Sequence, residues 1–539
     1  MNIKRSSNMA WLMAPLVAFL VSAPIRHVDG AGQQKVRPAA VAGSFYPADP
    51  KELSAMIDDM LAHAAPPPVD GAILAAVAPH AGYPFSGPVA AWTYAALKVH
   101  KYTRVVVIAP SHYVGFDFTS VYDGDAYETP LGTIPVDKEF ARQLTKMSST
   151  IRLSEQGHTP TSAGGEHAIE VELPWLQKVL GSFELVPIVM GDQSYESSRA
   201  LGVALAKMIQ DEKKNGHALG DTLILASSDL SHYHPYLDAE AIDHKTLHAL
   251  ETWDYYSMSR NFQTRTWEAC GGAPIVAAMI YAERMGANEA EVLRYMNSGD
   301  TSGDHSRVVG YSADLFVKGQ HEVVEPPFSL TDQEKSELLA LARKSAEYAV
   351  QTNKPYDPPA SKSEMLNQEY GAFVTINEGG MLRGCIGYTS PIKPLYLTVR
   401  DTAAYAATRD PRFRPVSTAE LSQLEYEISV LSPLRRVTDI EQIKVGRDGL
   451  FMKNGDDAGL LLPQVPVEQN WDLQTFLEQT CAKAGMRHDC WKDENTDIFK
   501  FTAQVFGEHS PDMGTILDPP TVPGRSQQPS RPGPGSPQP

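Results

Sequence analysis

Residues 103–112 read Thr-Arg-Val-Val-Val-Ile-Ala-Pro-Ser-His, an apolar run that ends on a histidine. Runs of the same kind lie at 71–78, 184–190 and 221–227. The polar groups that follow the four runs are His80, His112, Asp192 and the pair Asp229 and His232. Because the carboxyl ends of the strands in an open α/β sheet form the crevice where ligands bind, we expect these places to converge on one pocket.

Helical patterns alternate with the apolar runs along residues 36–318, which predicts a layered α/β domain. The expected helices are 51–64, 87–98, 168–180, 197–212, 237–252 and 274–285. Residues 319–329 are predicted as a linker, because they contain Glu-Val-Val-Glu-Pro-Pro-Phe.

Residues 330–515 predict a smaller α+β domain. A capping pattern, Ser329-Leu-Thr-Asp-Gln-Glu, indicates a first helix that runs to about Thr352. The other expected elements are strands at 371–377, 424–431 and 499–506 and helices near 394–407 and 471–485. Residues 516–539 are rich in Pro, Gly, Ser and Gln, so we expect a disordered, solvated tail.

The composition excludes several classes of protein. The 539 residues include 42% hydrophobic and 21% charged residues and carry a formal charge of −18. Nucleic acid is not an expected partner, because phosphate contacts need clustered Lys and Arg. The four cysteines contain no Cys-x-x-Cys pair, which does not resemble a zinc ribbon or a disulfide scaffold. At most, Cys481 and Cys490 are expected to bridge.

Residues 1–31 have the pattern of a signal peptide. Lys4 and Arg5 form a basic start, and an apolar run from Met9 to Ala23 follows. The pattern predicts a periplasmic or secreted protein with no integral membrane span after cleavage. The alternatives are an uncleaved membrane anchor, or a misassigned start codon and a cytoplasmic protein.

Two histidines and one cysteine are candidate metal ligands. His80 and His112 each follow a strand, so their imidazoles project from the edge of the predicted sheet. Cys270 precedes a predicted helix, whose dipole is expected to lower the pKa of the thiol. Imidazole with a soft thiolate favours Cu, Zn or Fe over Mg or Ca.

Three further residues are candidates for catalysis. Asp229 and His232 lie three residues apart after a strand, where one can act as a base while the other orients it. His167, beside Glu166, is expected at the rim of the pocket. The simpler interpretation is structural: a histidine that satisfies a buried carbonyl, a cysteine in the core, and an aspartate that caps a helix.

The order of these motifs resembles the Memo protein family over roughly residues 36–318. The matching segments are Arg37-Pro-Ala-Ala-Val-Ala-Gly-Ser-Phe-Tyr46-Pro, Ala-Pro-His80-Ala-Gly-Tyr83, Pro-Ser-His112, Gly-Glu-His167-Ala-Ile-Glu170, Ser-Ser-Asp229-Leu-Ser-His232 and Ala-Cys270-Gly-Gly. The resemblance implies a fold similar to the LigB-like class III extradiol dioxygenases. It also implies an iron or copper site, with His80, His112 and Cys270 as the metal ligands.

This resemblance predicts a non-haem iron (or copper) redox or dioxygenase-like domain, in which His232, Asp229 and His167 are the catalytic candidates. Fe²⁺ is the expected metal, with Cu or Zn as alternatives. The related dioxygenases place a carboxylate where this chain has Cys270, and a thiolate changes the redox behaviour of a metal. The alternative is a non-catalytic metal-binding module that binds a peptide or small ligand.

The second half resembles the AMMECR domain family over roughly residues 330–512. The matching segments include Tyr370-Gly-Ala-Phe-Val-Thr-Ile, Leu382-Arg-Gly-Cys385-Ile-Gly387 and Asp410-Pro-Arg412-Phe-Arg414. Cys385 is a candidate nucleophile in a positive pocket. The favoured interpretation is a tight Gly-rich turn, with the arginines paired to Asp401, Asp410 or Glu427.

Bacterial proteins that resemble these two halves belong to the AmmeMemoRadiSam system. The resemblance therefore implies a radical-SAM protein as a partner, besides a small-molecule or peptide ligand.

Overall fold

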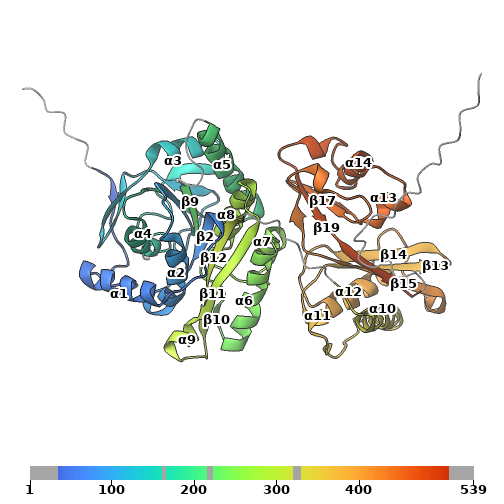
Figure 1. Cartoon of the computed structure of the whole chain (residues 1–539). Helices are drawn as coiled ribbons and strands as arrows, with labels where there is room; N and C mark the ends of the chain where they lie inside the picture. The colour runs from blue at the N-terminus through green and yellow to red at the C-terminus, as the bar shows by residue number, and fades with distance from the viewer. Residues whose placement is uncertain (1–33, 161–164, 215–221, 320–328, 509–539) are drawn as a thin grey trace, which may run out of the picture.

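The computed structural model describes residues 34–160, 165–214, 222–319 and 329–508. It confirms the expected fold class, an α/β domain followed by a smaller α+β domain (Figure 1). The predicted signal peptide, the predicted tail and most of the predicted linker lie outside the described residues. No helix in the described ranges combines the length and the apolar character that a membrane span requires.

The larger domain is built on a nine-stranded sheet. Its strand order is β10-β12-β2-β9-β3-β8-β4-β7, with β11 paired to β12. Four adjacent central strands run parallel: β2 (Gly71–Ala78), β9 (Thr222–Ser227), β3 (Arg104–Pro110) and β8 (Glu184–Met190). These are the four apolar runs of the sequence, so their carboxyl ends share one edge of the sheet.

Shorter or flanking strands complete the larger domain, and the sequence analysis did not predict them. In the large sheet they are β4 (Thr119–Tyr122), β7 (Ile151–Ser154), β10 (His232–His234), β11 (Glu289–Asn297) and β12 (Val308–Gly319). A separate small sheet contains β1 (Val36–Arg37), β5 (Ala126–Thr129) and β6 (Gly132–Pro135). β12 pairs antiparallel with β2, and β4 pairs antiparallel with β8.

Helices cover both faces of the large sheet. Alternate side chains divide between two cores, for example Val105 and Val107 on one face and Val106 and Ile108 on the other. The first face packs against α1 (Pro50–His63), α2 (Tyr83–Leu97), η1 (Glu170–Glu172) and α4 (Leu173–Leu180). The second packs against α3 (Lys138–Leu144), α5 (Tyr195–Lys214), α6 (Tyr236–Glu251), α7 (Tyr255–Gln263) and α8 (Gly272–Arg284). A short helix, α9 (Ser298–Ser302), leads into β12.

The smaller domain contains two four-stranded sheets. One has the order β14-β13-β15-β20 and the other β16-β19-β17-β18. The strands are β13 (Ala372–Glu378), β14 (Met381–Tyr388), β15 (Leu424–Leu431), β16 (Arg435–Arg436), β17 (Gly449–Asn454), β18 (Asp457–Leu461), β19 (Asp497–Phe501) and β20 (Ala503–Gly507). The run predicted as one strand at 499–506 is therefore two strands in different sheets.

The helices of the smaller domain follow the sequence signals closely. α10 (Asp332–Thr352) begins with the expected capping box, in which Thr331 and Glu334 each accept the other's backbone N–H. The remaining helices are α11 (Glu364–Asn367), α12 (Leu395–Thr408), η2 (Leu421–Gln423), η3 (Ile440–Gln442), α13 (Gln464–Glu468), α14 (Leu473–Lys483) and η4 (Cys490–Lys492).

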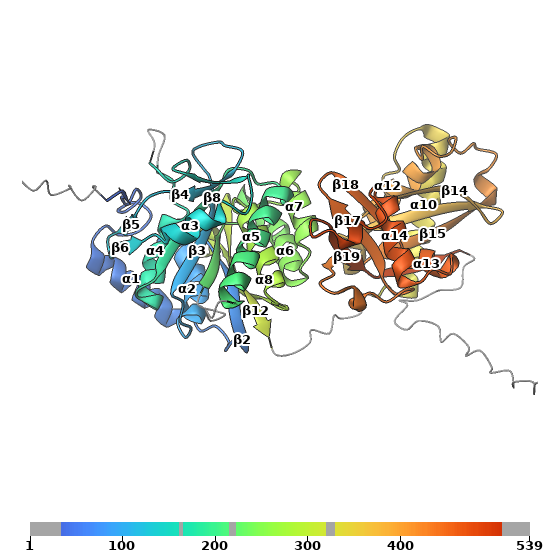
Figure 2. The same ribbon diagram turned by 90° about the horizontal axis from the view of Figure 1, so that it is seen from above.

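The two domains contact each other through α5, α7 and α8 of the larger domain and the β17–β19 sheet of the smaller one (Figure 2). Buried Asp497 on β19 accepts hydrogen bonds from Tyr195 at 2.8 Å, Arg199 at 2.5 Å and Arg284 at 3.2 Å. A cavity of about 620 Å³ also lies between the domains, with Trp267 and Tyr370 among its lining residues. The candidate ligands His80, His112 and Cys270 do not line it.

Candidate metal centre

Three adjacent parallel strands bring candidate ligands to one edge of the sheet. His80 follows β2, Asp229 follows β9 and His112 follows β3. Cys270 joins them from the loop before α8, and its Sγ lies 3.2 Å from His80 Nε2. Asp192, after β8, instead accepts hydrogen bonds from the backbone N–H and hydroxyl of Ser194, both at 2.9 Å. Its carboxylate is engaged in this turn before α5.

Two overlapping sets of donor atoms meet here. One set is His80, His112 and His167, and the other is His80, Asp229 and Cys270. Within each set the potential ligand atoms all lie within 4.8 Å of one another. His167 was expected only at the rim, but its ring stacks on that of His112 with centroids 4.8 Å apart. It belongs with the central imidazoles, because its ring also lies 5.5 Å from that of His80 and its side chain is only 12% exposed.

Ser227 fixes the orientation of the His80 ring. The Oγ of Ser227 lies 2.8 Å from His80 Nδ1 and 2.7 Å from the carbonyl oxygen of Ala168. It also lies 2.6 Å from a carboxyl oxygen of Glu172. The hydroxyl has one proton, which it donates toward these two oxygens, so it accepts a hydrogen bond from Nδ1–H of His80. This tautomer leaves the Nε2 lone pair of His80 directed toward Cys270.

Glu166 fixes the His112 ring in a similar way. Its carboxylate accepts hydrogen bonds from His112 Nδ1 at 2.9 Å and from the backbone N–H groups of His112, His167 and Ala168 at 2.7, 2.9 and 3.1 Å. Burial raises the pKa of Glu166, but these bonds and the nearby imidazole outweigh it and hold the pKa to about 2. A carboxylate that orients a histidine is a recurring feature of metal sites. In the sequence, Glu166 stands out only as the neighbour of His167.

The imidazoles differ in their affinity for protons. Burial and the neighbouring His112 lower the pKa of His80 well below its ordinary value. Burial and the other two rings lower the pKa of His167 to about 3. Burial also acts to lower the pKa of His112, but Glu166 outweighs it and the pKa is raised. At neutral pH, His80 and His167 are therefore neutral rings with free lone pairs.

The thiol of Cys270 corrects one expectation. Burial, followed by the charge of Asp229, raises its pKa instead of lowering it. The physical reason is its position: α8 begins at Gly272, so the half-buried Cys270 lies before the helix and beside Asp229. The backbone N–H of Asp229 donates to Cys270 Sγ at 3.2 Å. Burial likewise raises the pKa of Asp229.

His167 also contains a buried polar atom without a partner. Its Nδ1 has no hydrogen bond among the described residues and lies 3.8 Å from the nearest Glu166 oxygen. An unpaired buried nitrogen is costly unless a ligand satisfies it. Three imidazoles, one thiol and one carboxylate suit Fe, Cu or Zn and do not suit Mg or Ca. The residues present therefore fit a transition metal.

His232 lies outside both donor sets. Its Nδ1 is 2.8 Å from the carbonyl oxygen of Leu230, and its backbone N–H donates to Glu268 at 3.3 Å. The carbonyl can only accept, so the ring carries its proton on Nδ1 and leaves Nε2 as a base. The structure thus brings Asp229 and His167 into the cluster and keeps His232 beside it.

Hydrogen bonds and an ion pair join the segment 37–46 to the segment 166–172, which carries part of the cluster. Fully buried Glu170 forms an ion pair with Arg37 at 2.5 Å and accepts from the Tyr46 hydroxyl at 2.6 Å. It also accepts from the backbone N–H groups of Ala40 and Val41. The segment 166–172, which carries Glu166, His167 and Glu172, is thereby anchored to the first strand region of the domain.

Comparison with known proteins identifies the family of the larger domain. Residues 37–315 match the Memo-like protein family. The chain belongs to this family. It is similar to a MEMO1 family protein of Methanopyrus kandleri, with 38% identity over 293 residues that cover 52% of this chain and 99% of the relative. A MEMO1 family protein of Sulfolobus acidocaldarius is 35% identical over 51% of this chain and 97% of its own length.

The second half of this Memo-like protein matches the AMMECR1 family over residues 339–506. Protein PH0010 of Pyrococcus horikoshii is 43% identical over 205 residues, covering 36% of this chain and 99% of that relative. Its crystal structure, titled as an uncharacterized protein, covers 34% of this chain and 96% of its own, with a TM-score of 0.33.

The Leu-Arg-Gly-Cys-Ile-Gly motif of the AMMECR1 region lies in strand β14, not in a Gly-rich turn. Pairing with β13 keeps this segment extended. Arg412 pairs with Asp410, as expected, and this hydrogen bond holds the pKa of Asp410 to about 2. Arg383 pairs with Glu420 at 2.8 Å. These arginines are engaged by carboxylates, which favours the structural interpretation of Cys385.

Proposed function

We propose that this Memo-like protein holds a redox-active transition metal at the edge of its large sheet, with His80, His112 and Cys270 as ligands. Fe²⁺ is the first choice, and Cu or Zn are alternatives. The observation that carries the proposal is the position of His80, which lies within 4.8 Å of a ring nitrogen of His112 in one donor set and 3.2 Å from Cys270 Sγ in the other. His112 and Cys270 do not share a donor set among the described residues, so the proposal requires them to approach each other when a metal binds. Ser227 and Glu166 fix the orientation of the two rings before a metal binds.

The surrounding residues support a metal-dependent oxidoreductase of the dioxygenase-like type. A bound metal would supply Lewis acidity and electron transfer to a substrate held beside it. His80 is 1% exposed, so its side of the site is closed to water. The His112 side chain is 27% exposed and leaves a route from solvent. Asp229 and His167 orient a small ligand, and Nε2 of His232 accepts a proton from it.

Metal content and oxygen uptake test this proposal. The full chain, purified without chelator, should contain iron or copper that is lost in His80→Ala and Cys270→Ala. His63→Ala, which changes an exposed histidine of α1, should retain it. Oxygen uptake with catechol-type substrates would support catalysis. Metal without any turnover would support the alternative, a module that binds a peptide or small ligand, and absence of metal in the unsubstituted chain would remove both.

We further propose that the protein is exported to the periplasm or secreted. Cys481 and Cys490, the pair expected to bridge, form a disulfide in the smaller domain. Disulfides persist mainly in oxidising compartments, which supports export. Mass spectrometry of the mature N-terminus and of the thiol state tests this. An intact residue 1 together with free thiols at both Cys481 and Cys490 would contradict it.

A radical-SAM protein remains the proposed partner, on the basis of the two-family composition of the chain. Copurification of the two proteins from cells tests this partnership. Recovery of the full chain without the radical-SAM protein under cross-linking would count against it.

A further inference from the structure

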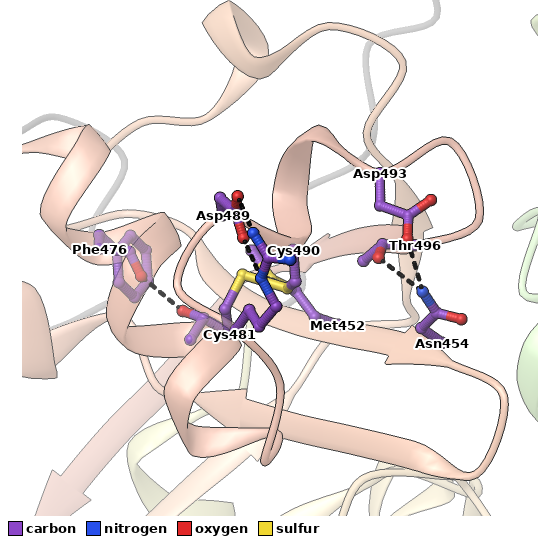
Figure 3. Close-up of a disulfide and its surroundings, with 10 residues drawn as sticks. Met452, Asn454, Phe476, Cys481, Asp489, Cys490, Asp493 and Thr496 are labelled. Carbon is purple, nitrogen blue, oxygen red and sulfur yellow. Dashed lines mark hydrogen bonds and ion pairs between the residues drawn. A yellow bond between two sulfur atoms is a disulfide. The ribbon is translucent and has the colours of Figure 1, made fainter.

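Three sulfur atoms converge in the core of the smaller domain, far along the chain from the proposed iron ligands. Met452 lies on β17, Cys481 on α14 and Cys490 in η4, and Figure 3 shows the methionine beside the disulfide. Met452 Sδ is 3.5 Å from Cys481 Sγ and 3.7 Å from Cys490 Sγ. The three side chains are 0%, 0% and 8% exposed.

We propose that reduction of this disulfide creates a binding site for Cu(I), with the two cysteine sulfurs and the methionine thioether as ligands. In a planar three-coordinate site with bonds of about 2.3 Å, the sulfurs stand about 4.0 Å apart. Both distances from Met452 are already close to this value. Only the separation between the two cysteine sulfurs has to grow, by about 2 Å from a disulfide bond.

The chemistry of the three sulfurs selects the ion. Thiolate and thioether are soft ligands, which favour Cu(I), whereas Mg and Ca require oxygen donors. The nearest acidic side chain in the sequence, Asp489, is engaged by Arg487 at 2.9 and 3.1 Å. No histidine, aspartate or glutamate among the described residues forms a metal-binding group with the two cysteines.

The surroundings of the sulfurs also suit a three-coordinate ion. They belong to a hydrophobic cluster that includes Leu450, Phe476, Leu477 and Ile498. These side chains exclude water, which would otherwise compete as a ligand and promote oxidation of Cu(I). A structural disulfide needs no methionine sulfur in contact with both of its sulfurs, so Met452 is the residue that distinguishes a binding site from a simple cross-link.

The reaction is balanced with a phosphine as the reductant. The phosphine and one water reduce the disulfide to two thiols, and the phosphine becomes its oxide. Cu(I) then replaces the two thiol protons, which are released to solvent. Copper changes no oxidation state in this sequence, so no further oxidant or reductant is required.

The test uses the full chain with His80→Ala and Cys270→Ser, which removes donors of the sheet-edge site. Under anaerobic conditions, the phosphine-reduced protein should take one equivalent of Cu(I) from acetonitrile-copper(I) that the oxidised protein does not take. X-ray absorption at the copper edge should show three sulfurs at about 2.3 Å. Uptake by the oxidised and reduced forms alike would overturn the proposal, as would a copper shell of nitrogen or oxygen.

Met452→Leu gives a second, independent test, because leucine keeps the volume of the core and leaves both cysteines in place. Its disulfide, detected by mass spectrometry, reports that the domain has folded. Cu(I) affinity should fall about tenfold or more in competition with bicinchoninate. Met486→Leu, a change in the same hydrophobic cluster, is the matched control and should bind as before. Equal affinity in Met452→Leu and the control would remove the three-sulfur site.

Discussion

Glu166→Gln is the substitution whose effect the structure specifies most fully. The side chain is 4% exposed and accepts four hydrogen bonds, two from His112 and two from the backbone of His167 and Ala168. Its pKa is about 2 in the folded protein against an ordinary value of 4.5. A carboxyl with this difference contributes about 3 kcal/mol to stability at neutral pH.

The sign of the pH dependence follows from the lowered pKa. The contribution of Glu166 is fully present above pH 4.5 and is lost as the pH falls from 4.5 to about 2, where the folded protein also takes up the proton. Glutamine should therefore lower the free energy of unfolding by about 3 kcal/mol at pH 7. The difference from the unsubstituted protein should shrink progressively as the pH falls below 4.5.

Urea unfolding of the protein, with metal removed by a chelator, measures this loss of stability. Metal titration measures a second effect of the substitution, on metal affinity. Without the carboxylate, the His112 ring is no longer held, so metal affinity should fall about 10–100-fold. Glu196→Gln is the control: its side chain is 52% exposed and pairs with Lys453, so it should cost less than about 1 kcal/mol. Equal stability and equal metal affinity in Glu166→Gln and the control would refute the reasoning.

Three further predictions concern buried charges and rings. Burial lowers the pKa of His158 to about 3, so the stability that its neutral ring provides is lost as the pH falls below 6.5. In His158→Gln, the slope of the unfolding free energy against pH should therefore decrease by about 1.4 kcal/mol per pH unit between pH 6.5 and 4. An unchanged slope in urea unfolding would contradict this. Glu170→Ala leaves Arg37 buried without its carboxylate partner and should lower the free energy of unfolding by about 3–5 kcal/mol, measured as a lower denaturation midpoint. A loss under about 1 kcal/mol would show that the ion pair is dispensable. Asp497→Ala removes the carboxylate that pairs with the half-buried Arg199 and Arg284 between the domains, so the two domains should unfold in two separate calorimetric transitions. An unaltered calorimetric profile would contradict the interface.

The central strands could be predicted because they are continuous apolar runs, which parallel strands buried on both faces require. The predicted ranges 71–78 and 184–190 coincide with β2 and β8. The convergence of His80, His112 and Asp229 followed from this prediction, because adjacent parallel strands end at one edge of the sheet. Short strands such as β4 and β7, of four residues each, gave no comparable signal.

The supporting contacts of the site could not be predicted. Ser227 and Glu172 look like ordinary residues of a strand and a helix. Only the contacts that Ser227 makes with His80 and with Glu172 identify their role. The raised pKa of Cys270 depends on burial by segments that are distant in sequence. The position of His167 among the imidazoles involves ring contacts with His80 and His112, which lie far away in the sequence. The break at Thr502, where the chain passes from one sheet to the other, has no signal in the sequence run 499–506.

X-ray absorption at the iron edge of the full chain, loaded anaerobically with Fe²⁺, tests the metal site most directly. We predict two imidazoles bound to the iron and one sulfur at about 2.3 Å from it. The iron should lose the sulfur ligand in Cys270→Ser and keep it in Cys385→Ser. A shell with no sulfur in the unsubstituted protein, or one that survives Cys270→Ser, would contradict the proposed site.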